Sequence, residues 1–296
     1  ALNCVANGRI RRDGPFERLF IQPAAGDAGA CLGAAALVHR QLTNTRPPHK
    51  PLPHVYLGPQ TTDSDIAILI EAMGIPAADY RLREPQLMSE IAQRLAEGQI
   101  VGWFHGRMEF GPRALGHRSI LADPRRPQMR ERLNRQIKQR ELFRPFAPSV
   151  LADNAAEHFD LTHPSPFMLE TCQVISPLAL PAVTHVDGSA RPQTVDAAVS
   201  PRFAALLQAF YEQTGCPILL NTSLNIRGEP IVCTAVEALY CLMRANLDVL
   251  VLENFVIERP DLPSNWPQLL ASWDIDPRFA FGQRQSAVSE TLYTFV

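Results

Sequence analysis

Arginines alternate with glycines in GRMEFGPRALGHRSI, residues 106–120. The segment holds Arg107, Arg113 and Arg118, and Arg125 follows shortly downstream. A solvated charged helix would contain lysine and no glycine. The guanidinium group is a fixed fork of donors that grips phosphate or carboxylate, and neighbouring glycines let backbone N–H groups approach an anion. The segment therefore predicts an anion site built around Arg107 and Arg113.

The same residues allow a plainer interpretation. Glu109 lies between Arg107 and Arg113, and a carboxylate there could hold one or both guanidinium groups in ion pairs that only brace a turn. Spacing alone leaves both alternatives open.

A second cluster of cations lies in IKQRELFRPFAP, which supplies Lys138, Arg140 and Arg144. On a helix, Lys138 and Arg140 would point about 200° apart. In an extended strand they share a face. We expect the extended conformation, which would direct both cations into one cleft.

Short polar side chains follow in LLNTSLN, where Asn221, Ser223 and Asn225 are two residues apart. This spacing places all three on one face at the end of a strand. Together with the arginines and the lysine, they would suit a polyphosphate and a small planar acyl group. The alternative is an Asn/Ser turn after the strand.

Composition narrows the function classes. The chain has 296 residues, of which 46% are hydrophobic and 20% charged, with a formal net charge of −2. A near-neutral balance argues against nucleic-acid binding, which needs a basic surface. No apolar run reaches membrane-spanning length, and the N-terminus lacks a signal-peptide pattern, so we expect a cytoplasmic protein. The six cysteines show no CxxC pair and are expected to be reduced.

Hydrophobic patterning predicts the elements that must position these residues. Helices are expected in DIAILIEAMGI, PQLMSEIAQRLAEGQ, PQMRERLNRQIKQRE, residues 201–214 and TAVEALYCLMRAN, and strands in IVGWFH, FAPSVL, ETCQVI, AVTHV, PQTVD, PILLNTS and DVLVLENFVIE. Strands and helices interleave, yet several strands follow one another directly. We therefore predict an α/β or α+β domain with a mixed sheet.

Several motifs in order resemble a known family. KQR and SLN match the KxR…SxN pattern of the YrdC/Sua fold. More specifically, GRMEFGPRALGHRSILADPR, RPFAPSVL, HVDGSARPQTV, NTSLNIRGEPIV and the upstream PAAGDAGACLGAA resemble the NodU/CmcH family of O-carbamoyltransferases. The resemblance covers about residues 1–258.

The resemblance implies a domain organisation. Residues 1–45 would be the end of a Kae-like, ASKHA-type domain, and 46–60 a proline-rich linker. Residues 61–258 would form a YrdC-like domain with a mixed twisted sheet and flanking helices. Residues 259–296 would be a C-terminal wrapping tail.

The resemblance also implies a reaction. The YrdC-like domain of this family forms carbamoyl-adenylate from carbamoyl phosphate and ATP, with Mg²⁺ on the nucleotide, for transfer to a hydroxyl of a small-molecule acceptor such as a sugar, a nodulation factor or an antibiotic. Carried over by position, the ligands of carbamoyl phosphate or the adenylate would be Arg113, Lys138, Arg144, Arg191 and Ser223. Arg107, Arg140, Asn221 and Asn225 would complete the site.

One departure from the family pattern concerns metal binding. The resemblance implies an iron-type metal in the Kae-like domain, but the HxxxH stretch expected early in that domain is absent here, and only Asp27 in AAGDAG matches a ligand. One carboxylate cannot hold a transition metal. We therefore expect the sequence to start inside the Kae-like domain, so the expected partners include a missing N-terminal domain. Asn3 and Asn7 would be remnants of its nucleotide wall.

Three questions stay open at this point. His117 is the best-placed acid–base candidate, against a structural hydrogen-bonding role. A non-catalytic nucleotide- or RNA-binding YrdC-like module is the rival to an enzyme. An inactive remnant is the third possibility.

Overall fold

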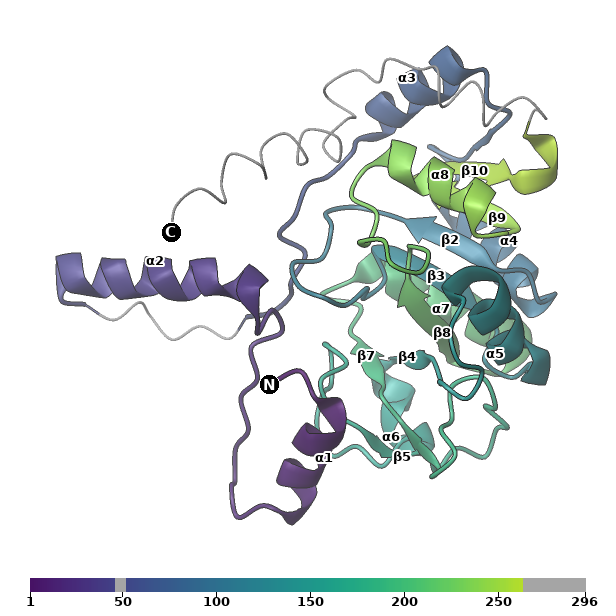
Figure 1. Ribbon diagram of the computed structural model, residues 1–296. Helices are drawn as coiled ribbons and strands as arrows, with labels where there is room; N and C mark the ends of the chain where they lie inside the picture. The colour runs from purple at the N-terminus through teal and green to yellow at the C-terminus, as the bar shows by residue number, and fades with distance from the viewer. Residues whose placement is uncertain (46–51, 263–296) are drawn as a thin grey trace.

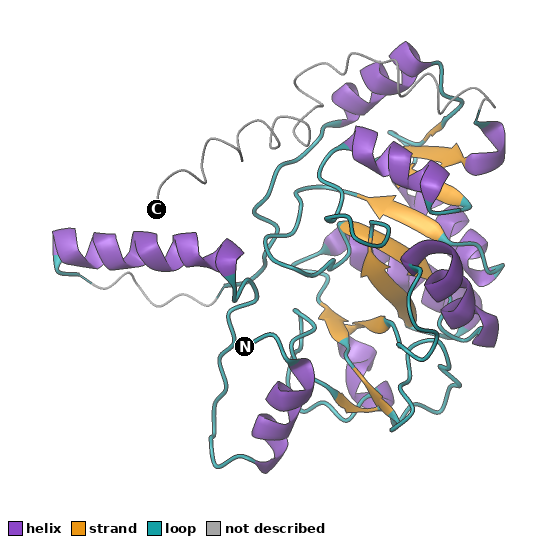
Figure 2. Ribbon diagram, viewed as in Figure 1, coloured by secondary structure: helices purple, strands orange, loops and turns teal. Residues whose placement is uncertain are grey.

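The chain forms an eight-stranded mixed sheet, seen in a computed structural model that describes residues 1–45 and 52–262 (Figures 1 and 2). The strand order is β1-β10-β9-β2-β3-β8-β4-β7. The bounds are β1 Ala78–Asp79, β2 Val101–Phe104, β3 Arg118–Ala122, β4 Ala147–Leu151, β7 Gln193–Val195, β8 Ile218–Ser223, β9 Val249–Leu252 and β10 Phe255–Glu258. A separate pair, β5 Cys172–Gln173 and β6 Ser189–Ala190, forms a two-stranded sheet.

The directions of neighbouring strands make the large sheet mixed. β2 runs parallel to β9, and β4 runs parallel to β7. The other pairs in the sheet are antiparallel. Because β2 and β9 are buried along their whole length, they carry continuous apolar runs rather than an alternating pattern. The mixed α/β architecture predicted from the sequence is confirmed.

Helices cover both faces of this sheet (Figure 2). α4 (Glu84–Ala96) and α7 (Pro201–Thr214) pack against each other behind it in the view of Figure 1, and α8 (Ala235–Arg244) lies in front. α3 (Asp63–Met73) and α5 (Pro127–Leu133) lie at its periphery, and the short α6 (Ala155–His158) follows β4. The core between the layers is filled by aromatic side chains such as Trp103, Phe203 and Phe210.

Local signals explain where the main helices begin and end. α8 begins with a capping box, in which Thr234 and Glu237 each satisfy the other's backbone N–H. α7 begins with Pro201 and ends at Gly215, whose left-handed backbone (φ 69°) suits glycine. These signals explain why the predicted helix over 201–214 has the same bounds in the structure.

The N-terminal segment contacts the domain through α1 and through Pro23 and Ala24, which are buried beside Gly111. In α1 (Cys4–Asp13), Asn7 donates to the Leu169 carbonyl and Arg11 pairs with Glu170 at 2.6 Å. α2 (Asp27–Thr43) instead projects away from the sheet (Figure 1), and none of its residues is buried. Leu37 and Val38 of this helix are therefore exposed.

The predicted linker contacts the domain through Val55. Residues 46–51 lie outside the described part of the chain, whereas Val55 is buried and its carbonyl accepts from the Phe110 backbone N–H. Of the predicted tail, 259–261 form a single 3₁₀ turn, and 263–296 lie outside the described residues.

Two of the predicted extended segments are wrong. AVTHV (182–186) is not a strand, because the backbone N–H groups of Val183 and Thr184 turn back to the Leu180 carbonyl. Lys138 does not lie in a strand either. It ends a π-helical turn, Asn134–Lys138, that continues α5, and Gln139 then adopts a left-handed conformation (φ 43°).

Three strands, β1, β3 and β6, are missing from the predictions, and β3 is the longest of them. β3 follows the last glycine of the arginine segment, for which no strand was expected. β3 pairs with β2 along one edge and with β8 along the other. Its strand conformation therefore depends on tertiary pairing and not on a local sequence pattern.

Candidate functional site

A cavity of about 130 Å³ lies where the glycine–arginine segment meets the end of β8. It collects side chains that are far apart in the sequence. Its lining residues are Pro112, Arg113, Ala114, Arg140, Pro145, Phe146, Ala147, Met168, Arg191, Asn221, Thr222 and Ser223. We call it the arginine cavity. Five of its lining residues were predicted as ligands: Arg113, Arg140, Arg191, Asn221 and Ser223.

Three guanidinium groups line the arginine cavity, and its wall contains no carboxylate. The pKa of Arg113 is lowered, first by burial and then by the charge of Arg191. The pKa of Arg140 is lowered by burial and by repulsion from Arg144 and Arg191. Arg113 Nε is buried and has no hydrogen-bond partner among the described residues. Guanidinium groups that share a wall without a carboxylate are suited to an anionic ligand.

Lys138 contacts Ser223 of the cavity wall and so joins two separate segments. Its Nζ lies 2.6 Å from the Ser223 carbonyl oxygen, 3.2 Å from Ser223 Oγ and 2.6 Å from Asn225 Oδ1. The predicted proximity of Lys138 to Ser223 is therefore confirmed, although a π-helical turn and not a strand supplies the lysine. Burial lowers the pKa of Lys138 to about 7.

A buried polar network fixes Asn221 at the cavity wall. Asn221 Nδ2 donates to Ser149 Oγ at 3.0 Å and to Gln193 Oε1 at 3.1 Å. Gln193 Nε2 in turn donates to the Leu115 carbonyl oxygen at 2.8 Å. Asn221 Oδ1 is buried and has no hydrogen-bond partner among the described residues.

The loop that presents Arg113 is held by a carboxylate. Glu109 Oε1 accepts from the backbone N–H groups of Leu115, His117 and Arg118 at 2.6, 2.9 and 3.3 Å. It forms no ion pair with Arg107 or Arg113 among the described contacts, so the turn-bracing alternative is wrong. Glu109 instead replaces the backbone partners that this irregular loop lacks.

Gly116 lets the same loop approach the sheet closely. Its backbone is left-handed (φ 102°), and a Cβ there would lie 2.3 Å from the Phe203 ring. Any larger residue would push the loop, and Arg113 with it, away from the cavity.

The other arginines of this segment have structural partners. Arg107 is exposed and donates to the Leu57 carbonyl oxygen. Arg118 is fully buried, donates to three backbone carbonyl groups and stacks on the Phe104 ring at 3.5 Å. Arg125 pairs with Asp123 at 2.8 Å. Arg113 is therefore the arginine of this segment that reaches the cavity.

Two more predicted ligands lie outside the wall of the arginine cavity. Arg144 is exposed and pairs with Glu141 at 3.2 Å. Asn225 Oδ1 accepts hydrogen bonds from Ser223 Oγ at 2.7 Å and from Lys138 Nζ at 2.6 Å, so Asn225 helps to fix the position of the lysine. Their roles as ligands stay predictions.

His117 is placed as a structural residue. Its ring stacks on Tyr56 with a centroid distance of 3.6 Å, and its Nδ1 lies 2.7 Å from the Arg107 carbonyl oxygen. Burial, and then the neighbouring His105, lower the pKa of His117 to about 3. A neutral, stacked imidazole favours the structural alternative over acid–base catalysis.

The residues expected at a metal and nucleotide wall are also accounted for. Asp27 lies exposed in the first turn of α2. Within residues 1–45 and 52–262, no group of three or more His, Cys, Asp and Glu side chains could hold a metal. Asn3 caps α1 by accepting from Ala6, and Asn7 bonds backbone carbonyl groups. The described residues do not fit an iron-type metal site.

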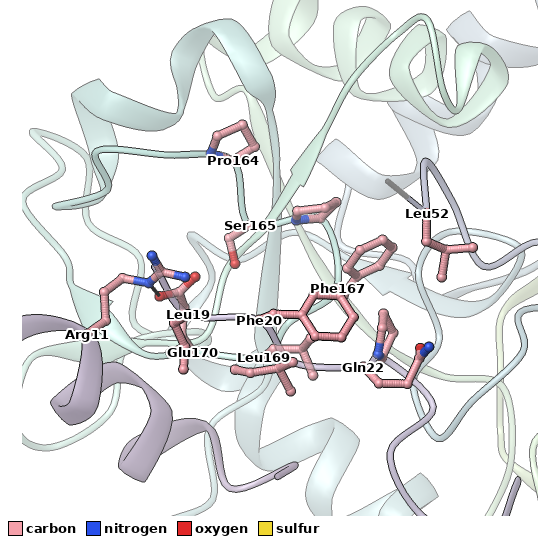
Figure 3. Close-up of a pocket in the computed structure, with 13 residues that line it drawn as sticks. Arg11, Leu19, Phe20, Gln22, Leu52, Pro164, Ser165, Phe167, Leu169 and Glu170 are labelled. Carbon is pink, nitrogen blue, oxygen red and sulfur yellow. Dashed lines mark hydrogen bonds and ion pairs between the residues drawn. The ribbon is translucent and has the colours of Figure 1, made fainter. Parts of the chain in front are cut away.

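A larger cavity of about 690 Å³ lies between α1 and the loop around Phe167 (Figure 3). None of the predicted site residues lines it. Its walls are mainly apolar, with Phe20, Phe167 and Leu169 at the centre of the view, and Arg11 is neutralised by Glu170. It lacks free cations to bind phosphate, so size alone does not identify the anion site.

Sequence reasoning missed the residues that hold Asn221. Ser149 and Gln193 are polar residues within otherwise buried strands, β4 and β7. A buried polar residue needs a hydrogen-bond partner. The polar side chains at these two positions could therefore have indicated a buried hydrogen-bond network. Thr222 and Met168, which also line the cavity, carried no such signal.

Two family models match the chain. The model described as carbamoyltransferase C-terminus matches residues 92–259, and the one described as carbamoyltransferase N-terminus matches residues 1–36. The C-terminal match includes every lining residue of the arginine cavity.

Among curated proteins, the chain is 47% identical to an uncharacterized protein of Synechocystis over 89% of its length. It is 41% identical to nodulation protein NolO of Bradyrhizobium diazoefficiens over 92%. It is 38% identical to 3'-hydroxymethylcephem-O-carbamoyltransferase of Amycolatopsis lactamdurans over 84%. The matches cover 47%, 50% and 46% of those proteins, so the chain spans about half the length of these relatives.

Solved structures give weaker matches. Full-length HypF in its phosphate- and nucleotide-bound form matches with a TM-score of 0.42 and 18% identity, over 57% of this chain and 25% of HypF. YciO of E. coli matches with a TM-score of 0.39 and 12% identity, over 60% of this chain and 94% of YciO. Among the described helices, none has the length and apolar character needed to cross a membrane.

Proposed function

The chain belongs to the carbamoyltransferase family, and from that premise we propose that the arginine cavity forms carbamoyl-adenylate from carbamoyl phosphate and ATP. The observation that carries the proposal is the cluster of Arg113, Arg140 and Arg191, which share one small cavity without a carboxylate in its wall. Such a cluster suits a ligand with several phosphate charges.

The proposed reaction balances with one water. Water cleaves carbamoyl phosphate to carbamate and inorganic phosphate. A carbamate oxygen then attacks the α-phosphorus of ATP, and the bond to pyrophosphate breaks. The products are carbamoyl-adenylate, pyrophosphate and phosphate.

The cations act on the charge that builds during this attack. Two anions must approach each other, and negative charge grows on the α-phosphate oxygens. Fixed guanidinium groups in a partly dehydrated cavity stabilise that charge without reorganising. Lys138 is held by Ser223 and Asn225. A bound anion nearby would favour its protonated form, and the resulting ammonium group would add a further positive charge beside the cavity.

Magnesium would arrive with the nucleotide. The cavity wall offers no carboxylate ligand, so Mg²⁺ would be held by the ATP phosphates and water, as is usual for this ion. It would neutralise the leaving pyrophosphate. The protein's own share is to bind and align the two substrates.

Transfer to an acceptor is the second part of the proposal. The name of the Amycolatopsis relative indicates a hydroxymethyl group as its acceptor. For this chain we propose the hydroxyl of a small molecule, with transfer completed by a domain that corresponds to the rest of the relatives' length. The exposed α2 would pack against that domain. No step is assigned to a metal, because the described residues do not fit one.

Calorimetric titration tests the assignment of the cavity. Carbamoyl phosphate and Mg·ATP are titrated into the wild type and into Arg191→Ala. The proposal predicts binding of both ligands by the wild type and a loss of at least tenfold in carbamoyl phosphate affinity in the variant. Equal affinities in the two proteins would contradict it, and preferential, salt-dependent binding of RNA would favour the non-catalytic module.

A further inference from the structure

The orientation of the Asn221 amide is determined by a chain of hydrogen bonds that starts at a backbone carbonyl. The Leu115 oxygen can only accept, so the Gln193 atom 2.8 Å away must be the nitrogen. Gln193 Oε1 therefore faces the other way. It accepts from Ser149 Oγ at 2.7 Å and from Asn221 Nδ2 at 3.1 Å.

These bonds use both hydrogens of the Asn221 amide. One is donated to Gln193 Oε1 and the other to Ser149 Oγ. The opposite orientation of the amide would place Oδ1 against Gln193 Oε1, and two acceptors would then repel each other. Asn221 Oδ1 therefore remains as an unpartnered acceptor on a side chain that is only 1% exposed and lines the arginine cavity.

Asn221 Oδ1 is a hydrogen-bond acceptor, whereas a site for an anion needs donors. The other polar groups of the wall include three guanidinium groups that can only donate. A buried acceptor without a partner costs stability, and a bound N–H group would remove that cost. A ligand that carries an N–H donor next to its negative charge would give Asn221 Oδ1 its missing partner.

We propose that Gln193 and Ser149 are positioning residues that hold Asn221 Oδ1 toward the NH₂ group of the carbamoyl moiety, and so make the site specific for carbamoyl over acetyl groups. The inference rests on the proposed function. Carbamoyl phosphate and acetyl phosphate differ only by NH₂ in place of CH₃, and a methyl group would leave Oδ1 unpartnered.

Titration with three ligands tests this specificity: carbamoyl phosphate, acetyl phosphate and inorganic phosphate. We expect the wild type to prefer carbamoyl over acetyl phosphate by about tenfold, the worth of one hydrogen bond at a buried acceptor. In Asn221→Ala this ratio should fall to about one, because neither ligand then meets the acceptor.

Gln193→Met distinguishes a positioning role from a purely structural one. Methionine keeps the length of the side chain but cannot hold the amide, so the ratio should fall to about one without loss of inorganic phosphate binding. Ser149→Ala is the milder control, because Gln193 still receives one Asn221 hydrogen, and it should keep most of the preference.

The outcomes separate this inference from the proposed function. A wild type that binds carbamoyl and acetyl phosphate equally, or an unchanged preference in folded Gln193→Met, would overturn the role of the network alone. If Gln193→Met does not fold, an unchanged preference in Asn221→Ala would do the same. Failure of the wild type to bind any of the three ligands would overturn the proposed function and this inference with it.

Discussion

The ammonium group of Lys138 lies 3.2 Å from the Ser223 hydroxyl, although 85 residues separate the two in sequence. The contact joins the end of the π-helical turn to the end of β8, beside the arginine cavity. It is also costly, because the lysine is only 7% exposed. We expect this cost to be visible in the stability of the protein without ligand.

Stability should therefore depend on pH through Lys138. Its pKa is about 7 in the folded chain against 10.5 for the free side chain. Between these values the unfolded chain binds more protons, so the free energy of unfolding should rise with pH across that window. Denaturant titrations from pH 7 to about 10 measure this slope. Lys138→Met should lack it, and identical slopes in the two proteins would show that the lysine is not desolvated.

The arginines should differ in their contributions to ligand binding. Arg113→Ala should weaken carbamoyl phosphate binding by about 1.5–3 kcal/mol, the worth of charge-assisted hydrogen bonds. Arg144→Ala should cost less than about 1 kcal/mol, since Arg144 is exposed and paired with Glu141. Arg126→Ala is the matched control. Arg126 lies 3.6 Å from the Asp123 carboxylate and does not line the arginine cavity. Equal losses for all three would disprove the assignment of the cavity.

Arg113 should destabilise the unliganded protein. Arg113 is partly buried, its Nε lacks a partner among the described residues, and the charge of Arg191 opposes it. Arg113→Met keeps the apolar part of the side chain and removes the charge, so we expect a gain of about 1 kcal/mol in the free energy of unfolding. Chemical denaturation without ligand measures it. A loss of stability would mean that Arg113 has structural partners.

His117 should stay neutral throughout the physiological range. Its pKa is about 3 against 6.5 for a free histidine, so the unfolded chain binds more protons between these values. Stability should then fall as pH drops below about 6.5. NMR of labelled histidine should show no titration of His117 between pH 5 and 8. A midpoint near 6.5 would make it an acid–base candidate again.

Much of the fold was predictable because buried elements carry dense local signals. The helix over 201–214 begins at a proline and ends at a glycine, and the strands β2 and β9 are continuous apolar runs. AVTHV has the same apolar, β-branched character, but the turn at Leu180 redirects it. Propensity could not reveal that, because the deciding hydrogen bonds belong to the preceding residues.

The site was predictable in part for a similar reason. Arg113, Arg140, Arg191, Asn221 and Ser223 were predicted ligands, and the structure brings them to one cavity. Arg107 and Arg113 looked alike in the sequence, yet of the two only Arg113 lines the cavity wall. The path of the loop that carries Arg113 depends on the hydrogen bonds of Glu109 and on the close approach of Gly116 to Phe203.

The supporting residues could not be predicted. The partnership of Gln193 with Asn221 depends on the register of β7 against β4 and of β4 against β8, where Ser149 pairs with Gln193 and Ala147 with Asn221. No local pattern encodes which strands become neighbours.

Pyrophosphate release tests the central claim most directly. The chain is incubated with ATP, Mg²⁺ and carbamoyl phosphate, and pyrophosphate is followed over time, with reactions lacking carbamoyl phosphate as the blank. We expect pyrophosphate release that requires carbamoyl phosphate and is abolished in Lys138→Ala and Arg113→Ala but not in Arg126→Ala. A folded chain that binds both substrates yet releases no pyrophosphate, or release that survives in both cavity variants, would contradict adenylate formation at the arginine cavity.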